Sequence, residues 1–509
     1  MTDPGARVAP RAGGRSRGLA LAVLCAATLM IILDGTIVTV ALPSIQADLG
    51  FSPASLTWVI NAYMIAFGGL LLLAGRLGDL IGRARVFLAG LAVFTLASLA
   101  CGLAGSPEFL IAARFVQGAG AALVSAVSLG MITGLYAEAR ERGRAIAAYS
   151  FTGAGGASVG LVLGGVLTQT AGWHWIFFVN LPAGIAAGLA GLRVLPAEPG
   201  AGLREGADAL GGVLVTGGLM AGVYALVGTA QHGWLSAPTL GFAAGAVVLL
   251  AAFVLRQARA ARPLLRLGIL SSRNVSGANL AQGLVIAAAF GFQVMIVLYM
   301  QRALGYSPAA AGLGLLPTAA VIGMVSLGLS ARLAMRFGAR TTLLAGLALV
   351  AAGLALLIGV PVHGDYSVHL LPAMLLFGVG GGLTLPALAM LGMSDATPAD
   401  AGIVSGLFNT TQQVGAAVGV ALLSTLAAAR TAHLTAAAGR PGALASAAAL
   451  TAGYRLAFAV GAGLAAGALI VAAVVLRPAE AGHAGAEPGE TEVVPADAAE
   501  AAGTAPRRG

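Results

Sequence analysis

The sequence predicts an all-α protein that crosses a membrane many times, and three observations support this prediction. Hydrophobic residues make up 58% of the 509 residues and charged residues only 9%, with a mean hydropathy of +0.92. Apolar stretches of about 20 residues, long enough to cross a hydrocarbon core of ~30 Å, recur along nearly the whole chain. The segments between them also alternate between arginine-rich and arginine-poor, which is the positive-inside pattern.

Fourteen of these stretches are predicted to be transmembrane helices, because each carries few charges over the length of a span. Gly and Ala are nearly neutral in lipid, so the ends are set only to about three residues. In chain order the spans cover residues 18–44, 57–75, 86–104, 108–132, 146–168, 174–193, 209–228, 238–256, 275–300, 309–331, 341–360, 368–393, 403–428 and 453–476.

The arginines fix the expected orientation. The chain has no lysine, and with a cytoplasmic N-terminus its 28 basic residues divide into 23 in inside segments, 3 outside and 2 within or at the ends of spans. The three outside are Arg302, Arg430 and Arg440. This asymmetry predicts fourteen spans with both termini in the cytoplasm. The tails, residues 1–17 and 477–509, are poor in apolar residues other than alanine and are predicted to be disordered.

Composition and charge also exclude several functions. A net charge of +9 needs no nucleic-acid partner, because the positive-inside rule and anionic lipid account for it. Cys25 and Cys101 lie in separate apolar spans, so neither a disulfide nor a metal site is expected. No phosphate-binding loop ending in lysine and no catalytic constellation is visible, so we expect no cofactor and no enzyme.

One carboxylate stands apart from the other eighteen. Asp34 lies deep in the first span, whereas every other acidic residue lies in a loop, in a tail or within a turn of a span end. A carboxylate near a helix centre costs about 2.5 to 3.5 kcal/mol on insertion scales and usually faces a bundle interior or a partner charge. With a rise of 1.5 Å per residue, Asp34 and Arg114 of the fourth span lie at similar depth below the outer edge. They can pair if helices one and four are neighbours.

Two motifs around these charges resemble a known family. Residues 33–43 (LDGTIVTVALP) and 114–122 (RFVQGAGAA) resemble the first- and fourth-helix motifs of the fourteen-helix drug:proton antiporter branch of the major facilitator superfamily. The resemblance implies that helices one and four pack together. It also implies that Asp34, Arg114 and Gln117 take part in proton coupling.

Residues 75–85 (GRLGDLIGRAR) resemble the inside-loop signature of the same superfamily, although Leu80 and Ala84 replace common basic residues. Glycines there permit a tight turn, and the charges can make ion pairs that open and close with an inner gate. The alternative is plain positive-inside anchoring. The gate residues expected from this motif are Gly75, Arg76, Gly78, Asp79, Gly82 and Arg83.

A weaker copy of this motif at residues 331–338 (ARLAMRFG) suggests two related halves and two inserted helices between them. This gives a 6 + 2 + 6 organisation of the major facilitator fold. Its parts are the tail 1–17, a six-helix bundle over 18–193, the inserted helices and linkers over 194–273, a second six-helix bundle over 274–476, and the tail 477–509.

The fifth span carries glycines every four residues, which form a smooth face for close helix packing. The residues are Gly156, Gly160, Gly164 and Gly165. The family's antiporter motif has a proline after the central glycine, where this chain has Leu161, so the direction of transport stays open at this point. Ordinary small-residue packing is the alternative interpretation.

Several amides are candidates for the wall of a substrate cavity. Residues 173–182 (WHWIFFVNLP) and 405–415 (SGLFNTTQQVG) resemble the family's sixth helix and this branch's penultimate helix. Side-chain amides in such helices either line a cavity or bond between helices. The candidates are Asn61, Asn180, Asn409, Gln412 and Gln413.

The prediction is a monomeric proton-coupled antiporter of the cell membrane that exports amphipathic drugs, antibiotics or related metabolites by alternating access. Its partners are the substrate, protons and the lipid bilayer. A single intramembrane acid favours monocationic, zwitterionic or neutral substrates over dications. An importer of a small metabolite is the alternative function, and a membrane sensor that transports nothing is a second.

Overall fold

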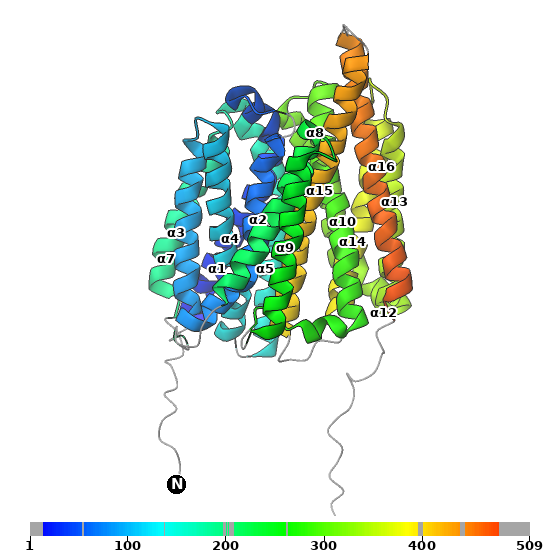
Figure 1. The fold of residues 1–509 in the computed structure, drawn as a ribbon. Coiled ribbons are helices and arrows are strands. Elements are labelled where there is room, and N and C mark those ends of the chain that lie inside the picture. Colours follow the sequence, from blue (N-terminus) through cyan, green and yellow to red (C-terminus); the bar gives the residue numbers. More distant parts are fainter. Residues whose placement is uncertain are drawn as a thin grey trace, which may run out of the picture.

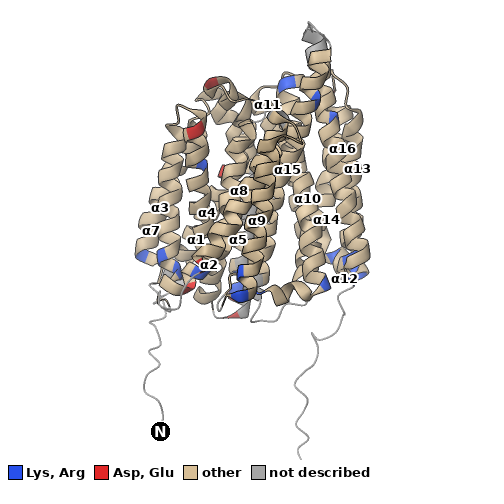
Figure 2. Ribbon diagram, viewed as in Figure 1, with Lys and Arg blue, Asp and Glu red and all other residues tan. Residues whose placement is uncertain are grey.

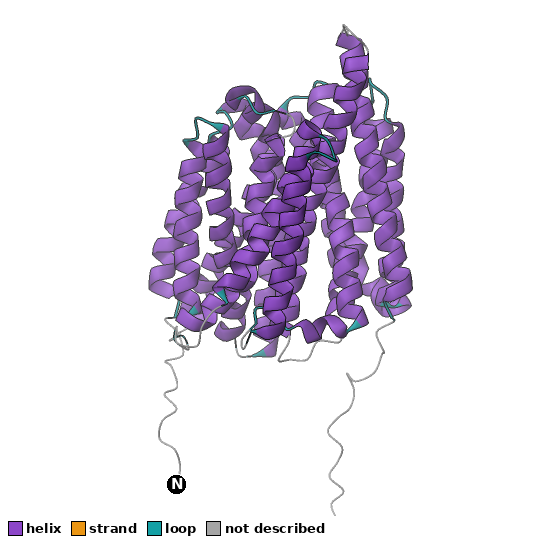
Figure 3. Ribbon diagram, viewed as in Figure 1, coloured by secondary structure: helices purple, strands orange, loops and turns teal. Residues whose placement is uncertain are grey.

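The described part of the protein is helical throughout. The computed structural model describes residues 14–52, 55–136, 138–196, 200, 202, 208–260, 263–394, 401–437 and 443–477. Within these ranges Figure 3 shows helices joined by short loops and turns. The prediction for the tail 478–509 and for residues 1–13 lies outside the described residues. Residues 14–17, predicted as tail, instead form the first turn of α1.

The helices follow the predicted order of spans. The first six positions are taken by α1 (Gly14–Leu49), α2 (Trp58–Ile81), α3 (Arg83–Gly102), α4 (Pro107–Leu135), α5 (Ala139–Thr170) and the pair α6 (Trp175–Phe178) and α7 (Asn180–Val194). The next two are α8 (Ala209–His232) and α9 (Ala237–Arg259). The last six begin with α10 (Arg273–Leu298), α11 (Pro308–Met324) with its continuation α12 (Ala331–Phe337), and α13 (Ala339–Leu356), and end with α14 (Leu371–Met393), α15 (Ala401–Ala437) and α16 (Ala443–Val475).

Thirteen of the described helical segments are long and apolar enough to cross a membrane. The fifth predicted span corresponds to α5, a helix of 32 residues whose described apolar part is Val159–Thr170. The chain is therefore a multi-pass membrane protein, as its composition predicts.

Two predicted inside loops are wrong, because the helices continue through them. Helix α2 runs to Ile81 and α3 starts at Arg83, so only Gly82 separates them. Gly338 alone separates α12 from α13 in the same way. Both glycines have positive φ, 99° at Gly82 and 85° at Gly338, which side chains other than glycine rarely adopt. Arginines on these last turns can reach the polar interface, so the helices extend beyond the hydrocarbon core.

The helices pack into two groups, seen side by side in Figure 1. In the first group α1 packs on α5 and α7, and α4 packs on α2 and α3. In the second, α10 packs on α15 and α16, and α13 packs on α14. The groups meet where α5 packs on α11 and α2 on α15. Helices α8 and α9 form a hairpin in which α8 contacts both α2 and α15.

Asp208 joins the two helices of this hairpin at one end through hydrogen bonds. It caps α8 by accepting from Gly211 N, and it accepts from Arg256 Nε and Gln257 Nε2 of α9, both at 2.7 Å. Burial acts to raise the pKa of Asp208, but the hydrogen bonds of Arg256, Gly211 and Gln257 outweigh it and hold this pKa below its ordinary value. The Asp208 carboxylate that joins α8 to α9 is therefore ionised at neutral pH.

The two ends of the bundle differ in charge. The start of α1 and the end of α16 lie at the same end (Figure 1), which we call the inner end. Figure 2 shows arginines concentrated there and only a few at the outer end. This distribution is the one predicted for a membrane protein with its inner end in the cytoplasm.

Candidate functional site

Asp34 lies at the centre of a closed polar cluster between four helices. Arg114 Nη1 of α4 donates to Asp34 Oδ2 over 2.5 Å. Gln117, one turn further along α4, donates to Asp34 Oδ1 over 2.8 Å, and Asn180 at the start of α7 donates to the same oxygen over 3.0 Å. The side chains of Asp34 and Arg114 are 0% and 1% exposed. The carboxylate therefore has a partner charge and donors on both oxygens, which a buried ion pair needs to offset its desolvation.

A second set of groups holds these donors in place. Ser98 of α3 accepts from Gln117 Nε2 over 2.8 Å and donates to Phe94 O over 2.8 Å. Arg114 Nε donates to Val59 O over 2.8 Å. The guanidinium also lies 4.3 Å from the ring centroid of Tyr63, a cation–π distance. We call Asp34, Ser98, Arg114, Gln117 and Asn180 the Asp34 cluster.

Sequence reasoning missed Ser98 and Tyr63. Ser98 shares one face of α3 with Cys101, whose thiol donates to Gln117 Oε1 over 3.6 Å, because residues three apart are neighbours on a helix. A polar face in the third span was the available signal. Nothing in the sequence pointed to Tyr63.

The glycines of α5 contact two different helices. Three of them face α1. A Cβ added at Gly160 would lie 3.0 Å from Leu33 O, and one added at Gly164 would lie 2.7 Å from Ile37 O. A Cβ added at Gly156 would lie 2.9 Å from the side chain of Leu29. Gly165 faces α11 instead, where a Cβ would lie 2.5 Å from Pro308 O. The first three glycines thus pack α5 on its own group of helices, and Gly165 packs it on the other group.

Gly165→Val is expected to open the outer end of the helix bundle, because the added side chain collides with backbone atoms of α11 and must push α5 and α11 apart. Ile32 lines a cavity between the two groups of helices. A cysteine at this position, in a background without Cys25 and Cys101, can therefore show from which side of the membrane the cavity is accessible. We expect an impermeant maleimide to label it from outside in the Gly165→Val variant and only from inside in its parent. Gly245→Val is the control, since nothing lies within 4 Å of its Cβ position.

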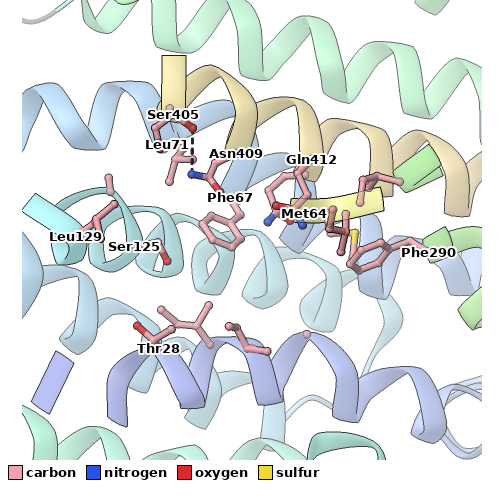
Figure 4. Close-up of a pocket in the computed structure, with 18 of the residues that line it drawn as sticks. Thr28, Met64, Phe67, Leu71, Ser125, Leu129, Phe290, Ser405, Asn409 and Gln412 are labelled. Carbon is pink, nitrogen blue, oxygen red and sulfur yellow. Dashed lines mark hydrogen bonds between the residues drawn. The ribbon is translucent and has the colours of Figure 1, made fainter. Parts of the chain in front are cut away.

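A large cavity lies between the two groups of helices. Its volume is about 1690 Å³, and it reaches the inner end at Asp79, Arg83 and Arg266. Figure 4 shows side chains of α1, α2, α4, α10 and α15 around it, among them Phe67, Phe290 and Gln412. The described lining residues include none from the loops at the outer end.

Contacts between the two groups close the outer end. Gln301 Nε2, just after α10, donates to Val40 O of α1 over 2.9 Å. Arg302 donates to Gln46 Oε1, near the end of the same helix. The arrangement therefore has a cavity that extends inward and a closed outer side.

The predicted amides fall into two sets. Asn409, Gln412 and Gln413 of α15 line the cavity. Asn61 and Asn180 do not, so their predicted place on the wall is wrong: Asn180 is buried in the Asp34 cluster, and Asn61 is 0% exposed within the helix packing. Asp34, Arg114 and Gln117 are likewise absent from the wall. Sequence motifs place an amide on a helix but do not give the direction it faces.

The predicted gate residues lie at the inner end, and all of them except Gly82 are on helices. Gly75, Arg76, Asp79 and Arg83 line the cavity there. Arg83 contacts Asp79 over 3.4 Å and donates to Gly130 O of α4 over 3.3 Å. Gly78 packs against Val127 of α4, and Gly82 makes the turn. These contacts join α2, α3 and α4 within one group of helices.

Comparison with known proteins gives a consistent result. The family model described as Major Facilitator Superfamily matches residues 24–420. The puromycin resistance protein pur8 of Streptomyces alboniger is 41% identical over 81% of this chain and 82% of its own. The cephamycin export protein CmcT of Amycolatopsis lactamdurans is 42% identical over 80% of this chain and 84% of its own. Among solved structures, an auto-inhibited peptide transporter of the POT family has a TM-score of 0.66, is 16% identical, and matches over 92% of this chain and 99% of its own.

Proposed function

The chain belongs to the Major Facilitator Superfamily, and we propose that it uses the proton gradient to export amphipathic antibiotics or related metabolites from the cell. It is a transporter of the cell membrane and not an enzyme. Two relatives that match four fifths of the chain are named for resistance to an antibiotic and for the export of one. These names support export over the import of a metabolite.

The geometry that supports proton coupling is the buried pair of Asp34 and Arg114. The carboxylate is stabilised as an anion while Arg114, Gln117 and Asn180 hold it. In the proposed cycle the outward-facing state opens this cluster to water and Asp34 takes up a proton. Return to the inward-facing state restores the pairing with Arg114 and releases the proton to the cytoplasm.

Alternating access would arise from rocking of the two six-helix groups, which we propose to be residues 18–193 and 274–476. Opening the outer side requires the loss of the contacts Gln301–Val40 and Arg302–Gln46 and the separation of α5 from α11 at Gly165. The residues at the inner end of α2, from Gly75 to Arg83, would approach the second group as the cavity closes inside. The transporter is proposed to work as a monomer.

Asn180→Ala is expected to lower the melting temperature of the detergent-solubilised protein and to slow transport. It removes one of the donors to the buried Asp34 carboxylate, while Arg114 and Gln117 stay in place. A hydrogen bond to a charged group contributes about 1.5–3 kcal/mol. The measurements are the thermal transition and the transport rate at pH 7.5.

Asn61→Ala is the matched control for this loss. Asn61 is as buried as Asn180, but its amide atoms have no hydrogen-bond partner among the described residues. Its melting temperature and transport rate should stay close to those of the wild type. Equal losses in both variants would show that Asn180 acts through helix packing rather than through Asp34.

Proton-coupled export is tested in inside-out membrane vesicles that have been acidified inside. Puromycin, a cephamycin and a panel of amphipathic dyes are added in turn while acridine orange fluorescence reports the pH gradient. We expect at least one compound to discharge the gradient in wild-type vesicles and not in vesicles without the protein. If correctly inserted protein gives no discharge with any compound, and labelled compounds accumulate without a gradient, proton coupling is wrong.

A further inference from the structure

We propose that the cavity selects uncharged amphipathic substrates that carry hydrogen-bonding groups, and that it discriminates against permanent cations. This inference rests on the proposed export function and narrows its substrate class. It comes from the kinds of side chain on the wall and from the position of Asp34 relative to the wall.

The charged residues of the wall lie only at its inner end. Among the described residues that line the cavity they are three arginines and one aspartate: Arg76, Arg83, Arg266 and Asp79. Asp79 is already in contact with Arg83 over 3.4 Å. A cation approaching from the cytoplasm therefore meets a basic rim, which disfavours it.

The deeper wall is polar without being charged. Gln293 of α10 and Asn409, Gln412 and Gln413 of α15 face the cavity. No described residue makes a hydrogen bond with the amide groups of Gln293, Gln412 or Gln413. Asn409 uses only its Nδ2, which donates to Ser405 O over 3.1 Å. Each amide offers both donors and an acceptor, so the wall can bind carbonyl, hydroxyl or amide groups of a substrate.

Apolar and aromatic groups complete this wall. Figure 4 shows Gln412 next to Met64, with Phe290 beyond it, and Asn409 near Phe67. Tyr63 also lines the cavity. An amphipathic molecule with a ring can thus place its apolar part against these side chains while its polar groups contact the amides, the usual arrangement of small-molecule sites.

Asp34 cannot neutralise a bound cation in this state. It is fully buried, it does not line the cavity, and its carboxylate is already paired with Arg114. The ring of Tyr63 lines the cavity and lies over the guanidinium of Arg114, so Tyr63 separates the cavity from the Asp34 cluster. A cation on this wall would lose water without gaining a carboxylate, which is unfavourable. Exchange of a proton for an uncharged substrate also carries a positive charge inward on each cycle.

The test compares two dansyl probes of nearly equal size with purified full-length protein at pH 7.5. One is the dansyl amide of N-acetylethylenediamine, which is uncharged, and the other is the dansyl amide of 2-aminoethyltrimethylammonium, a permanent cation. Binding is followed by dansyl fluorescence. We expect the uncharged probe to bind at least about tenfold more tightly, because the described residues of the deeper wall include no carboxylate to pair with the charge.

Two variants separate this inference from general loss of structure. Gln412→Glu introduces an acid on the wall and should improve binding of the cation relative to the uncharged probe by about tenfold or more. Glu108→Gln should leave binding of both probes within about twofold of the wild type, because Glu108 is exposed and lies outside both the cavity and the Asp34 cluster. Binding of the probes needs no proton gradient. A preference for the uncharged probe in a protein that shows no proton-driven transport would therefore overturn the proposed function and leave the substrate class standing.

Equal or tighter binding of the cation by the wild type would overturn the inference. So would failure of the folded wild type, with an intact thermal transition, to bind the uncharged probe. An unchanged preference in the Gln412→Glu variant would also overturn it, because the charge of the wall would then not decide between the two probes.

Discussion

Asp34→Asn is expected to reduce proton-driven export to the level of vesicles without the protein, although the variant inserts and folds. Asparagine keeps the size of the side chain and its carbonyl oxygen still accepts from Arg114. It cannot take up and release a proton between pH 5 and 9. The coupling group is lost, and the buried guanidinium of Arg114 loses its counter-charge, so a lower melting temperature is also expected and export is compared per amount of folded, inserted protein.

The control for this variant is Glu108→Gln, the same change of acid to amide in the first turn of α4. Glu108 is exposed and lies outside the Asp34 cluster, so its loss should leave the rate of export unchanged. The measurement is discharge of the pH gradient by the same compound in both variants, normalised to the amount of inserted protein. Full activity of Asp34→Asn would remove Asp34 from the mechanism.

Arg114→Leu is expected to destabilise the protein strongly, because it leaves the Asp34 carboxylate buried without its partner. Removing one member of a buried ion pair costs about 3–5 kcal/mol. The substitution also removes the donors to Val59 O and Gln117 Oε1 and the contact with the ring of Tyr63. A clear fall in the melting temperature of the detergent-solubilised protein should follow, together with loss of export.

The double variant Arg114→Leu with Asp34→Asn distinguishes charge burial from lost packing. Removing the carboxylate as well should restore a substantial part of the melting temperature, because no unpaired charge is left in the core. Export should stay absent in the double variant. If its melting temperature is no higher than that of Arg114→Leu alone, the destabilisation comes from packing rather than from an unpaired Asp34.

The sequence could predict the fold and the centre of the site because both depend on strong, one-dimensional signals. Length and polarity define the spans, and their order matches the helices of the structure. The rise per residue placed Asp34 and Arg114 at similar depth, and the structure shows them in contact. That the first and fourth helices are neighbours was predicted only from the family resemblance, because the depth of a residue does not show which helices pack together.

The direction a side chain faces could not be predicted in the same way. Helices buried on most sides have no clear apolar stripe, so Asn61 and Asn180 were indistinguishable from Asn409 by pattern alone. Helix ends were also misplaced, because arginines near Gly82 and Gly338 look like loop residues although they continue the helix. Tyr63 contacts Arg114 across helices, a relation that only the packed structure shows.

The most direct test of the central claim, that Asp34 carries the exchanged proton, is to measure the proton movement that accompanies substrate transport. Purified protein is reconstituted in liposomes that hold a pH indicator, and a compound identified in the vesicle assay is added outside. We predict that transport of the compound by the wild type drives protons in the opposite direction and that Asp34→Asn moves no protons. Equal proton movement by both proteins would contradict the claim and place the coupled proton on another group.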